Sequence, residues 1–135
     1  MMRRLAEQPP ALPFDAGEVQ RALEGFFPHP EYGRAWLVEV AGSVVGYVIL
    51  TLGYSFEYRG RDGFVDELYI EPEFRRKGLG RQAMEFVEAR AREMGVNALH
   101  LEVDTKNEAA MELYRRAAYE DHDRYLMTKW LNRAR

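Results

Sequence analysis

A pair of glycines set among basic side chains is the feature of this sequence best suited to chemistry. Gly78 and Gly80 stand where a strand-like segment gives way to a helical pattern, and the basic side chains around them are Arg75, Arg76, Lys77 and Arg81. The first turn of an α-helix leaves backbone N–H groups without partners and carries partial positive charge. Glycines remove the Cβ atoms that would keep an anion away from those groups. The loop therefore predicts a phosphate-binding site, and a pyrophosphate is its natural guest.

Known phosphate-binding patterns compete for this loop. A P-loop requires Gly-Lys-Ser/Thr at a fixed distance from a first glycine, and that pattern is absent. Gly78, Gly80 and Ala83 fit the Gly-x-Gly-x-x-Gly/Ala dinucleotide pattern, with an acidic residue about 20 positions on, such as Glu102. In that fold the glycines follow the strand almost at once, whereas residues 71–77 intervene here. Few residues remain after Glu102 to build further parallel strands, so dinucleotide binding ranks second.

A third pattern fits better. Arg75-x-x-Gly78-x-Gly80 resembles the acetyl-CoA pyrophosphate loop of the GNAT superfamily of N-acetyltransferases, written Gln/Arg-x-x-Gly-x-Gly/Ala. The flanking segments that also look like this family are residues 68–75, residues 99–103, Asn107 and Leu113-Tyr114. The resemblance implies an enzyme that transfers acetyl from acetyl-CoA, its co-substrate, to a primary amine of a small molecule or peptide. The amine would attack directly in a ternary complex.

The resemblance also implies a set of cofactor contacts. The pantetheine arm would add as a pseudo-strand to the backbone of residues 68–70, which is sound physics for an amide-bearing chain. Asn107 would contact the same arm. The residues expected to bind the cofactor are Leu68, Tyr69, Ile70, Arg75, Arg76, Lys77, Gly78, Leu79, Gly80, Arg81, Asn107 and Tyr114.

Three side chains are candidates for proton transfer. Tyr114 matches the tyrosine that protonates the leaving sulfur in many family members, and its spacing from Asn107 puts both on one helix face. Glu102 matches a base of relatives that acetylate protein N-termini. Glu67, with Asp66, matches an acidic pair of relatives that acetylate polyamines. Strand alternation predicts that Asp66 and Glu67 point to opposite faces. The base is left open between Glu67 and Glu102, and ordered water can also deprotonate an amine.

The acceptor is expected to be a cationic amine, such as a polyamine, a lysine-like side chain or an aminoglycoside. Acidic residues gather near the aromatic stretch Tyr54–Tyr58, and carboxylates with aromatic faces stabilise ammonium groups. These acidic residues are Glu57, Asp62, Asp66 and Glu67. The competing class is a non-catalytic module that binds or senses acyl-CoA. Nucleic-acid binding is disfavoured by the net charge of −3.

The elements that must position these residues follow the order α-ββ-β-α-β-α-β. We expect one mixed, mostly antiparallel sheet flanked by helices, an α/β (α+β) fold like that of the GNAT family. The expected helices are 16–27, 79–94 and 108–117, the expected strands are 36–40, 44–50, 64–70, 99–103 and 124–131, and residues 53–63 are expected to form a loop or an irregular strand extension.

Residues 1–13 are expected to form a loose lead-in to a single domain, residues 14–135. The family usually has a further strand and helix before Phe14, so the N-terminal part is shortened and a partner chain, in a homodimer, could complete the groove. Ala118 stands where relatives commonly carry glycine, so the turn after the last helix is expected to differ locally.

Composition narrows the remaining classes. The chain has 135 residues, of which 47% are hydrophobic and 30% charged, which is typical of one globular domain. There is no cysteine and the three histidines lack metal-ligand spacing, so no disulfide and no metal site are expected. No apolar run approaches the roughly 20 residues of a membrane span, and no secretory signal is evident. The cytoplasm is therefore the expected compartment.

Overall fold

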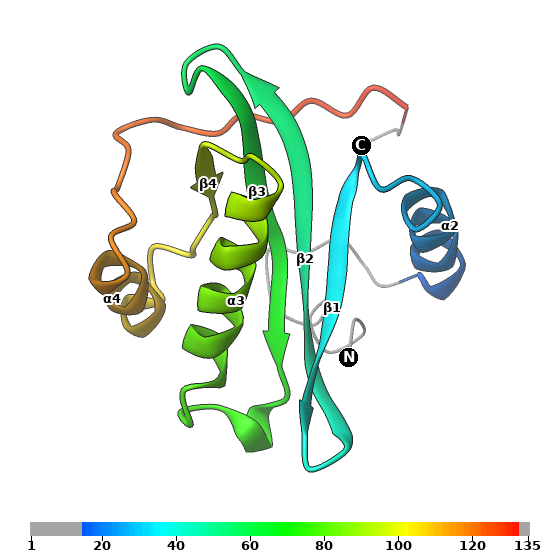
Figure 1. Cartoon of the computed structure of the whole chain (residues 1–135), viewed down its shortest axis with the longest axis vertical. Helices are drawn as coiled ribbons and strands as arrows, with labels where there is room; N and C mark the ends of the chain where they lie inside the picture. Colours follow the sequence, from blue (N-terminus) through cyan, green and yellow to red (C-terminus); the bar gives the residue numbers. More distant parts are fainter. Residues whose placement is uncertain (1–14, 133–135) are drawn as a thin grey trace. The chain divides into compact units, whose positions relative to one another are not determined.

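The computed structural model describes residues 15–132, so the predicted lead-in lies outside the described residues. The chain falls into two compact units that divide between Glu102 and Val103. The first contains a four-stranded sheet in the order β1-β2-β3-β4, which confirms a mixed, mostly antiparallel sheet (Figure 1). Its elements are α2 (Ala16–Phe26), β1 (Gly33–Val40), β2 (Ser43–Ser55), β3 (Gly60–Ile70), the 3₁₀ turn η1 (Pro72–Phe74), α3 (Leu79–Glu93) and β4 (Ala98–His100). The second contains α4 (Glu108–Arg116).

The predicted hairpin between β1 and β2 is confirmed. Ala41 and Gly42 have φ of 50° and 81°, and a tight hairpin turn of type I′ requires positive φ at both central residues. Of the two alternatives for residues 53–63, the strand extension is confirmed for most of the segment, and only residues 56–59 form a turn. β2 and β3 stay paired as far as Ser55 and Gly60, and Tyr54 in this part of β2 is of a type that favours strands even when it is exposed.

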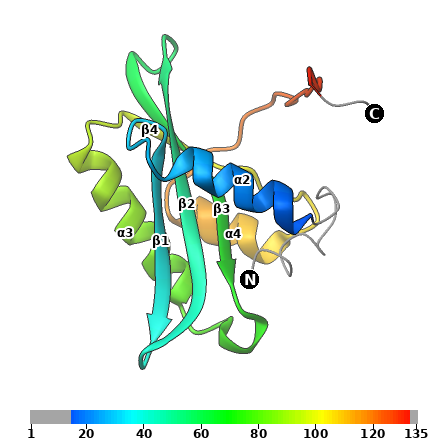
Figure 2. The same ribbon diagram turned by 90° about the vertical axis from the view of Figure 1, so that its right-hand side faces the viewer.

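The two faces of the sheet carry different helices (Figure 2). On one face lies α3, which buries Ala83, Met84, Val87 and Ala91. Of the residues expected on its apolar face, Phe86 is instead 44% exposed and lies edge-on to Trp36. On the other face, Phe26 at the end of α2 packs against a cluster of Tyr47, Ile49 and Tyr69. Because both faces are covered, β2 is apolar without interruption over its middle part.

The strands β3 and β4 separate after a short stretch of parallel pairing. Only Asp62–Phe64 pairs with Ala98–His100, and beyond Phe64 no described strand covers that edge of β3. Asp66 forms a β-bulge, because Ile49 pairs with Glu67 while Leu50 pairs with Val65. A bulge bends its strand and increases the local twist. The predicted strand 99–103 is therefore too long, and its part after His100 is not strand.

In the second unit, Asn107 caps α4 as predicted: its Oδ1 accepts the N–H of Ala110 at 3.1 Å. The prediction of a different turn at Ala118 is wrong. Ala118 has φ of 71°, and the N–H of Tyr119 donates to Tyr114 O at 2.9 Å, as in the usual glycine-ended helix. An alanine in this conformation costs about 1–2 kcal/mol.

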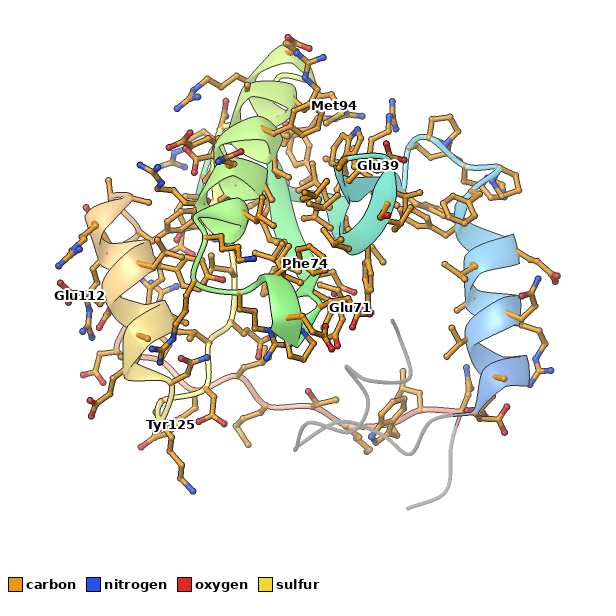
Figure 3. All side chains as sticks on the ribbon, turned by 90° about the horizontal axis from the view of Figure 1, so that it is seen from below. Glu39, Glu71, Phe74, Met94, Glu112 and Tyr125 are labelled. Atoms are coloured by element: carbon orange, nitrogen blue, oxygen red, sulfur yellow. The ribbon has the colours of Figure 1, made fainter. Side chains whose placement is uncertain are left out.

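The predicted closing strand, residues 124–131, is also wrong. The described residues after α4 form no strand, and Tyr125 and Met127 are 97% and 90% exposed (Tyr125 is labelled in Figure 3). The segment has strand-like composition, but strand formation depends on packing and pairing more than on intrinsic preference. Within residues 15–132, no helix has the length and apolar character needed to cross a membrane.

Candidate active site

The N-terminus of α3 is open. Gly78 is its N-cap with φ of 80°, and no side chain caps it. The N–H of Gln82 donates to Gly78 O at 3.1 Å, and within residues 15–132 the N–H groups of residues 78–81 have no acceptor. A Cβ built on Gly78 or Gly80 would meet nothing within 4 Å. The glycines therefore leave a clear approach to backbone donors, as an anion site needs.

The basic side chains of the loop are held in different ways. Arg75 Nε donates to the carbonyl of Ile70 at 2.8 Å, and its guanidinium lies 5.4 Å from the centre of the Tyr69 ring. Lys77 lies over the ring of Phe74, which Figure 3 labels beside Glu71 on the turn before α3. Arg76 has φ of 62°, a strained conformation that is common at functional sites. Arg75 thus fastens the loop to the end of β3.

The backbone of residues 68–70 lies next to this loop. One edge of this segment pairs with β2, in the register Leu68–Val48, Tyr69–Tyr47 and Ile70–Gly46. Its other edge has no strand partner in the part of the chain that the structure describes. Unpaired N–H and C=O groups on such an edge can accept an extended chain that contains amides.

Glu67 lies on the α2 face of the sheet and is held by Tyr47. The Tyr47 hydroxyl donates to Glu67 Oε1 at 2.7 Å, and the Tyr47 side chain is almost fully buried. Burial raises the pKa of Glu67, the Tyr47 hydrogen bond opposes this, and the charge of Asp66 raises it further. Burial, followed by the bond to Glu67, also raises the pKa of Tyr47. A carboxylate with a raised pKa is suited to accept a proton near neutral pH.

The bulge changes the relation between Asp66 and Glu67. Their predicted placement on opposite faces rests on strict alternation, which the bulge at Asp66 breaks. The two side chains interact electrostatically, and burial also raises the pKa of Asp66. The charge of Asp66 therefore affects the protonation of Glu67.

A second polar group shares the face of Glu67. Asp62 Oδ2 lies 3.1 Å from His100 Nε2, and the ring of Tyr58 lies 4.7 Å from the ring of His100. Ile49 and Thr51 point to one face of β2, and their partners on β3 are Glu67 and Phe64. His100 pairs with Phe64 in turn. Asp62 and His100 therefore lie on the same face of the sheet as Glu67, further from the end of β3.

The remaining predicted site residues are Glu102, Asn107 and Tyr114. Glu102 is exposed, beyond the end of β4. Asn107 and Tyr114 lie in the second unit, where burial raises the pKa of Tyr114 and its ring lies 5.9 Å from that of Tyr119. Their roles stay predictions.

Sequence reasoning missed Tyr47. Its apolar surroundings in the sequence marked it as a core residue, and only the strand register shows its hydroxyl reaching Glu67. Counting pairs back from the turn between β2 and β3 would align Tyr47 with Leu68, because the bulge at Asp66 shifts the register by one residue, so no signal in the sequence points to this bond.

Comparison with known proteins gives consistent matches. The model of the acetyltransferase (GNAT) family matches residues 1–119. Thialysine N-epsilon-acetyltransferase of Bos taurus is 33% identical over 78 residues, 58% of this chain and 45% of that protein. D-amino-acid N-acetyltransferase HPA3 of Saccharomyces cerevisiae is 39% identical over 56 residues, 42% of this chain and 35% of that protein.

A solved structure matches over nearly the whole chain. An integron cassette protein from the mobile metagenome of Cole Harbour Salt Marsh superposes with a TM-score of 0.84 and 32% identity, covering 98% of this chain and 82% of that one. By contrast, this chain spans less than half the length of the two curated relatives, 45% and 35%.

Proposed function

Because the chain belongs to the GNAT acetyltransferase family, we propose that it transfers an acetyl group from acetyl-CoA to a primary amine. The observation that carries this proposal is the uncapped, basic N-terminus of α3 next to the unpaired edge of β3. The first suits a pyrophosphate and the second suits an amide-bearing arm, so the two fit adjoining parts of one cofactor.

Residues 78–81 would hold the pyrophosphate through their backbone N–H groups, with added charge from Arg75, Arg76 and Lys77. Only Nε of Arg75 is engaged in a hydrogen bond within the described chain, so its two terminal nitrogens are available to phosphate oxygens. Acetyl-CoA supplies the acetyl group as a thioester. The backbone of residues 68–70 would orient its arm, with Asn107 as a further contact.

Glu67 is the base that the geometry supports best. Its carboxylate takes a proton from the acceptor ammonium, directly or through water, and the freed amine nitrogen bonds to the thioester carbon. The C–S bond then breaks, and the thiolate takes a proton from Tyr114, the acid that the family resemblance implies. The nitrogen loses its second proton, which returns to the Tyr114 phenolate through water, and Glu67 releases the first proton to solvent. The products are an amide and free CoA. Glu102 is the second candidate for the base, and its side chain is exposed beyond the end of β4.

The acceptor belongs to the class of small cationic amines. The matched relatives are named for acetylation of thialysine and of D-amino acids, both of which carry amino and carboxyl groups. Asp62 lies further along the same face as Glu67, so a second positive group of the acceptor could bind there while the first amine reacts. A monoamine would lack that contact.

We also propose that the chain forms a homodimer. Large apolar side chains remain exposed in the described chain, and exposed apolar patches commonly mark interfaces. Among them are Phe27, Leu37, Leu126, Met127 and Leu131. Light scattering at micromolar concentration should give the mass of two chains, and the mass of one chain would contradict it.

The test of the proposed function is an acetyl-CoA turnover assay across amino acids, polyamines and aminoglycosides, with free thiol as the readout. We expect thiol release that depends on the amine and is faster with diamines, including diamino acids, than with monoamines. A chain that binds acetyl-CoA and releases no thiol with any amine would instead be an acyl-CoA-binding or sensing module.

A further inference from the structure

We propose that Tyr47 is the positioning residue of the base, and that it decides which oxygen of Glu67 receives the proton of the acceptor amine. This inference rests on the proposed function and deepens it, because it assigns the group that orients the base. Tyr47 is buried, so its proposed action is through Glu67.

The hydrogen bond makes the two oxygens of the carboxylate unequal. Tyr47 donates to Glu67 Oε1 at 2.7 Å, whereas Oε2 has no partner within residues 15–132. The two residues lie diagonally across neighbouring rungs of the sheet, since Tyr47 pairs with Tyr69 and Ile49 with Glu67. With Oε1 occupied, Oε2 is the oxygen that is left to accept a proton.

The phenol is held rigidly enough to act as a fixed donor. Tyr47 is 5% exposed, and its ring centre lies 6.1 Å from that of Tyr69, which is 2% exposed. The guanidinium of Arg75 lies over the Tyr69 ring and is fastened to the carbonyl of Ile70. The chain of contacts therefore runs from the phosphate loop to the base. Turning the phenol away would break this packing and leave a buried hydroxyl without a partner.

The hydrogen bond from Tyr47 also affects the pH at which Glu67 becomes ionised. Two titratable groups act on Glu67 in the described chain, Tyr47 from β2 and Asp66 from β3. Burial and Asp66 raise the pKa of Glu67, and the donated bond favours its charged form. Tyr47 thus keeps the carboxylate ionised, and ready to accept a proton, at a lower pH than its burial alone would allow.

The experiment compares Tyr47→Phe with the parent over the acidic and neutral pH range, with an amine that the parent acetylates. The acidic limb of kcat/KM should move to higher pH by about one unit. On the plateau kcat should fall about 10- to 100-fold, as expected when a hydrogen bond to a charged group is lost. In a Glu67→Gln background, Tyr47→Phe should have no further effect. Tyr32→Phe, at a half-exposed tyrosine before β1, is the matched control and should leave the profile unchanged.

An equal loss of rate at every pH, with the acidic limb in place, would show that Tyr47 has only a structural role and would overturn the inference. So would a profile that superimposes on that of the parent. An additive effect of Tyr47→Phe in the Glu67→Gln background would overturn it too.

A second measurement separates this inference from the proposed function, because it needs no turnover. The raised folded-state pKa of Glu67 means that its favourable contribution to stability is full at low pH and is lost as pH rises through that pKa. Tyr47→Phe removes the hydroxyl that stabilises the charged form of Glu67 and so limits this loss of stability. Denaturant unfolding should therefore show a larger destabilisation of Tyr47→Phe above the titration of Glu67 than below it. Equal destabilisation on both sides would overturn the link, whether or not any amine is acetylated.

Discussion

The helices α2 and α4 begin in one way and α3 begins in another. Asp15 Oδ1 accepts the N–H of Glu18 at 3.0 Å at the start of α2, and Asn107 Oδ1 does the same for Ala110 at the start of α4. Each of these helices also has an acidic residue in its first turn, Glu18 or Glu108. Side chains therefore satisfy the free donors and the partial positive charge of both N-termini.

At α3 the same groups are left unsatisfied. Gly78 offers no capping side chain, the first turn has no acidic residue, and Arg81 adds positive charge to it. Compared with a helix that has a side-chain cap, this start is less stable by roughly a few tenths of a kcal/mol, because glycine is a tolerated N-cap residue. We therefore propose that an anion from outside the chain completes the start of α3, whereas side chains of the chain itself complete those of α2 and α4.

The comparison also restricts Asn107. Its Oδ1 is occupied by the cap of α4, so only its amide nitrogen is left for the contact with the cofactor arm that the family resemblance implies. α4 would then serve the chemistry through Tyr114, and α3 would serve binding through its open end.

The largest expected effect tests this division of labour. Tyr114→Phe should lower kcat about 10²–10⁴-fold with little change in the Kd of acetyl-CoA, because it keeps the ring and removes only the proton donor. Steady-state turnover and calorimetric binding on the same preparation check both halves. A variant within about threefold of the parent would assign the protonation of the thiolate to water.

Gly80→Val should instead weaken the binding of acetyl-CoA. The Cβ of residue 80 points into open space, so the fold should survive while the new side chain blocks the approach of phosphate. Acetyl-CoA affinity should fall by at least about 100-fold. Gly25→Val in α2 is the matched control, because a Cβ there also meets nothing within 4 Å. Unchanged affinity in a folded Gly80→Val protein would refute the role of the open helix end.

The C-terminal ends of α3 and α4 sharpen the contrast between the two helices. Both end in the same hydrogen-bonded turn, but Gly95 has φ of 76° at one end and Ala118 has φ of 71° at the other. Ala118→Gly should stabilise the protein by about 1 kcal/mol, and Gly95→Ala should destabilise it by a similar amount. Denaturant midpoints measure both. A loss of stability in Ala118→Gly would mean that the left-handed turn at Ala118 is not strained.

The smallest expected effect comes from reversing the charge of one residue in the first turn of α3. Arg81→Glu places an acidic residue in the first turn of α3, so it should stabilise the ligand-free protein by about 0.3–1 kcal/mol and weaken acetyl-CoA binding. Glu18→Arg in α2 should destabilise by a similar amount and leave binding unchanged. If Arg81→Glu bound acetyl-CoA as tightly as the parent, the charge of this turn would have no part in the site.

The sequence alone predicted the parts of the site that depend on local order. The glycine spacing, the basic flank and the caps at Asp15 and Asn107 need only residues that are close along the chain. The alternating and apolar runs likewise located β1 to β3 and α3 to within a few residues at most ends.

What depends on strand register escaped prediction. The bulge at Asp66 and the bond from Tyr47 to Glu67 exist only because β2 and β3 align as they do. The segment 124–131 failed for a related reason, since a strand needs a partner that its own residues do not specify. Ala118 shows the limit of a residue preference, because tertiary structure can hold an alanine where glycine is favoured.

The most direct test of the account is the thermal stability of the parent protein with acetyl-CoA and, separately, with NAD. If the open end of α3 holds the pyrophosphate of CoA, acetyl-CoA at 100 times its Kd should stabilise the fold by about 2.7 kcal/mol, and NAD should have no comparable effect. A clear shift with NAD and none with acetyl-CoA would contradict the account, because the glycine loop would then serve a dinucleotide.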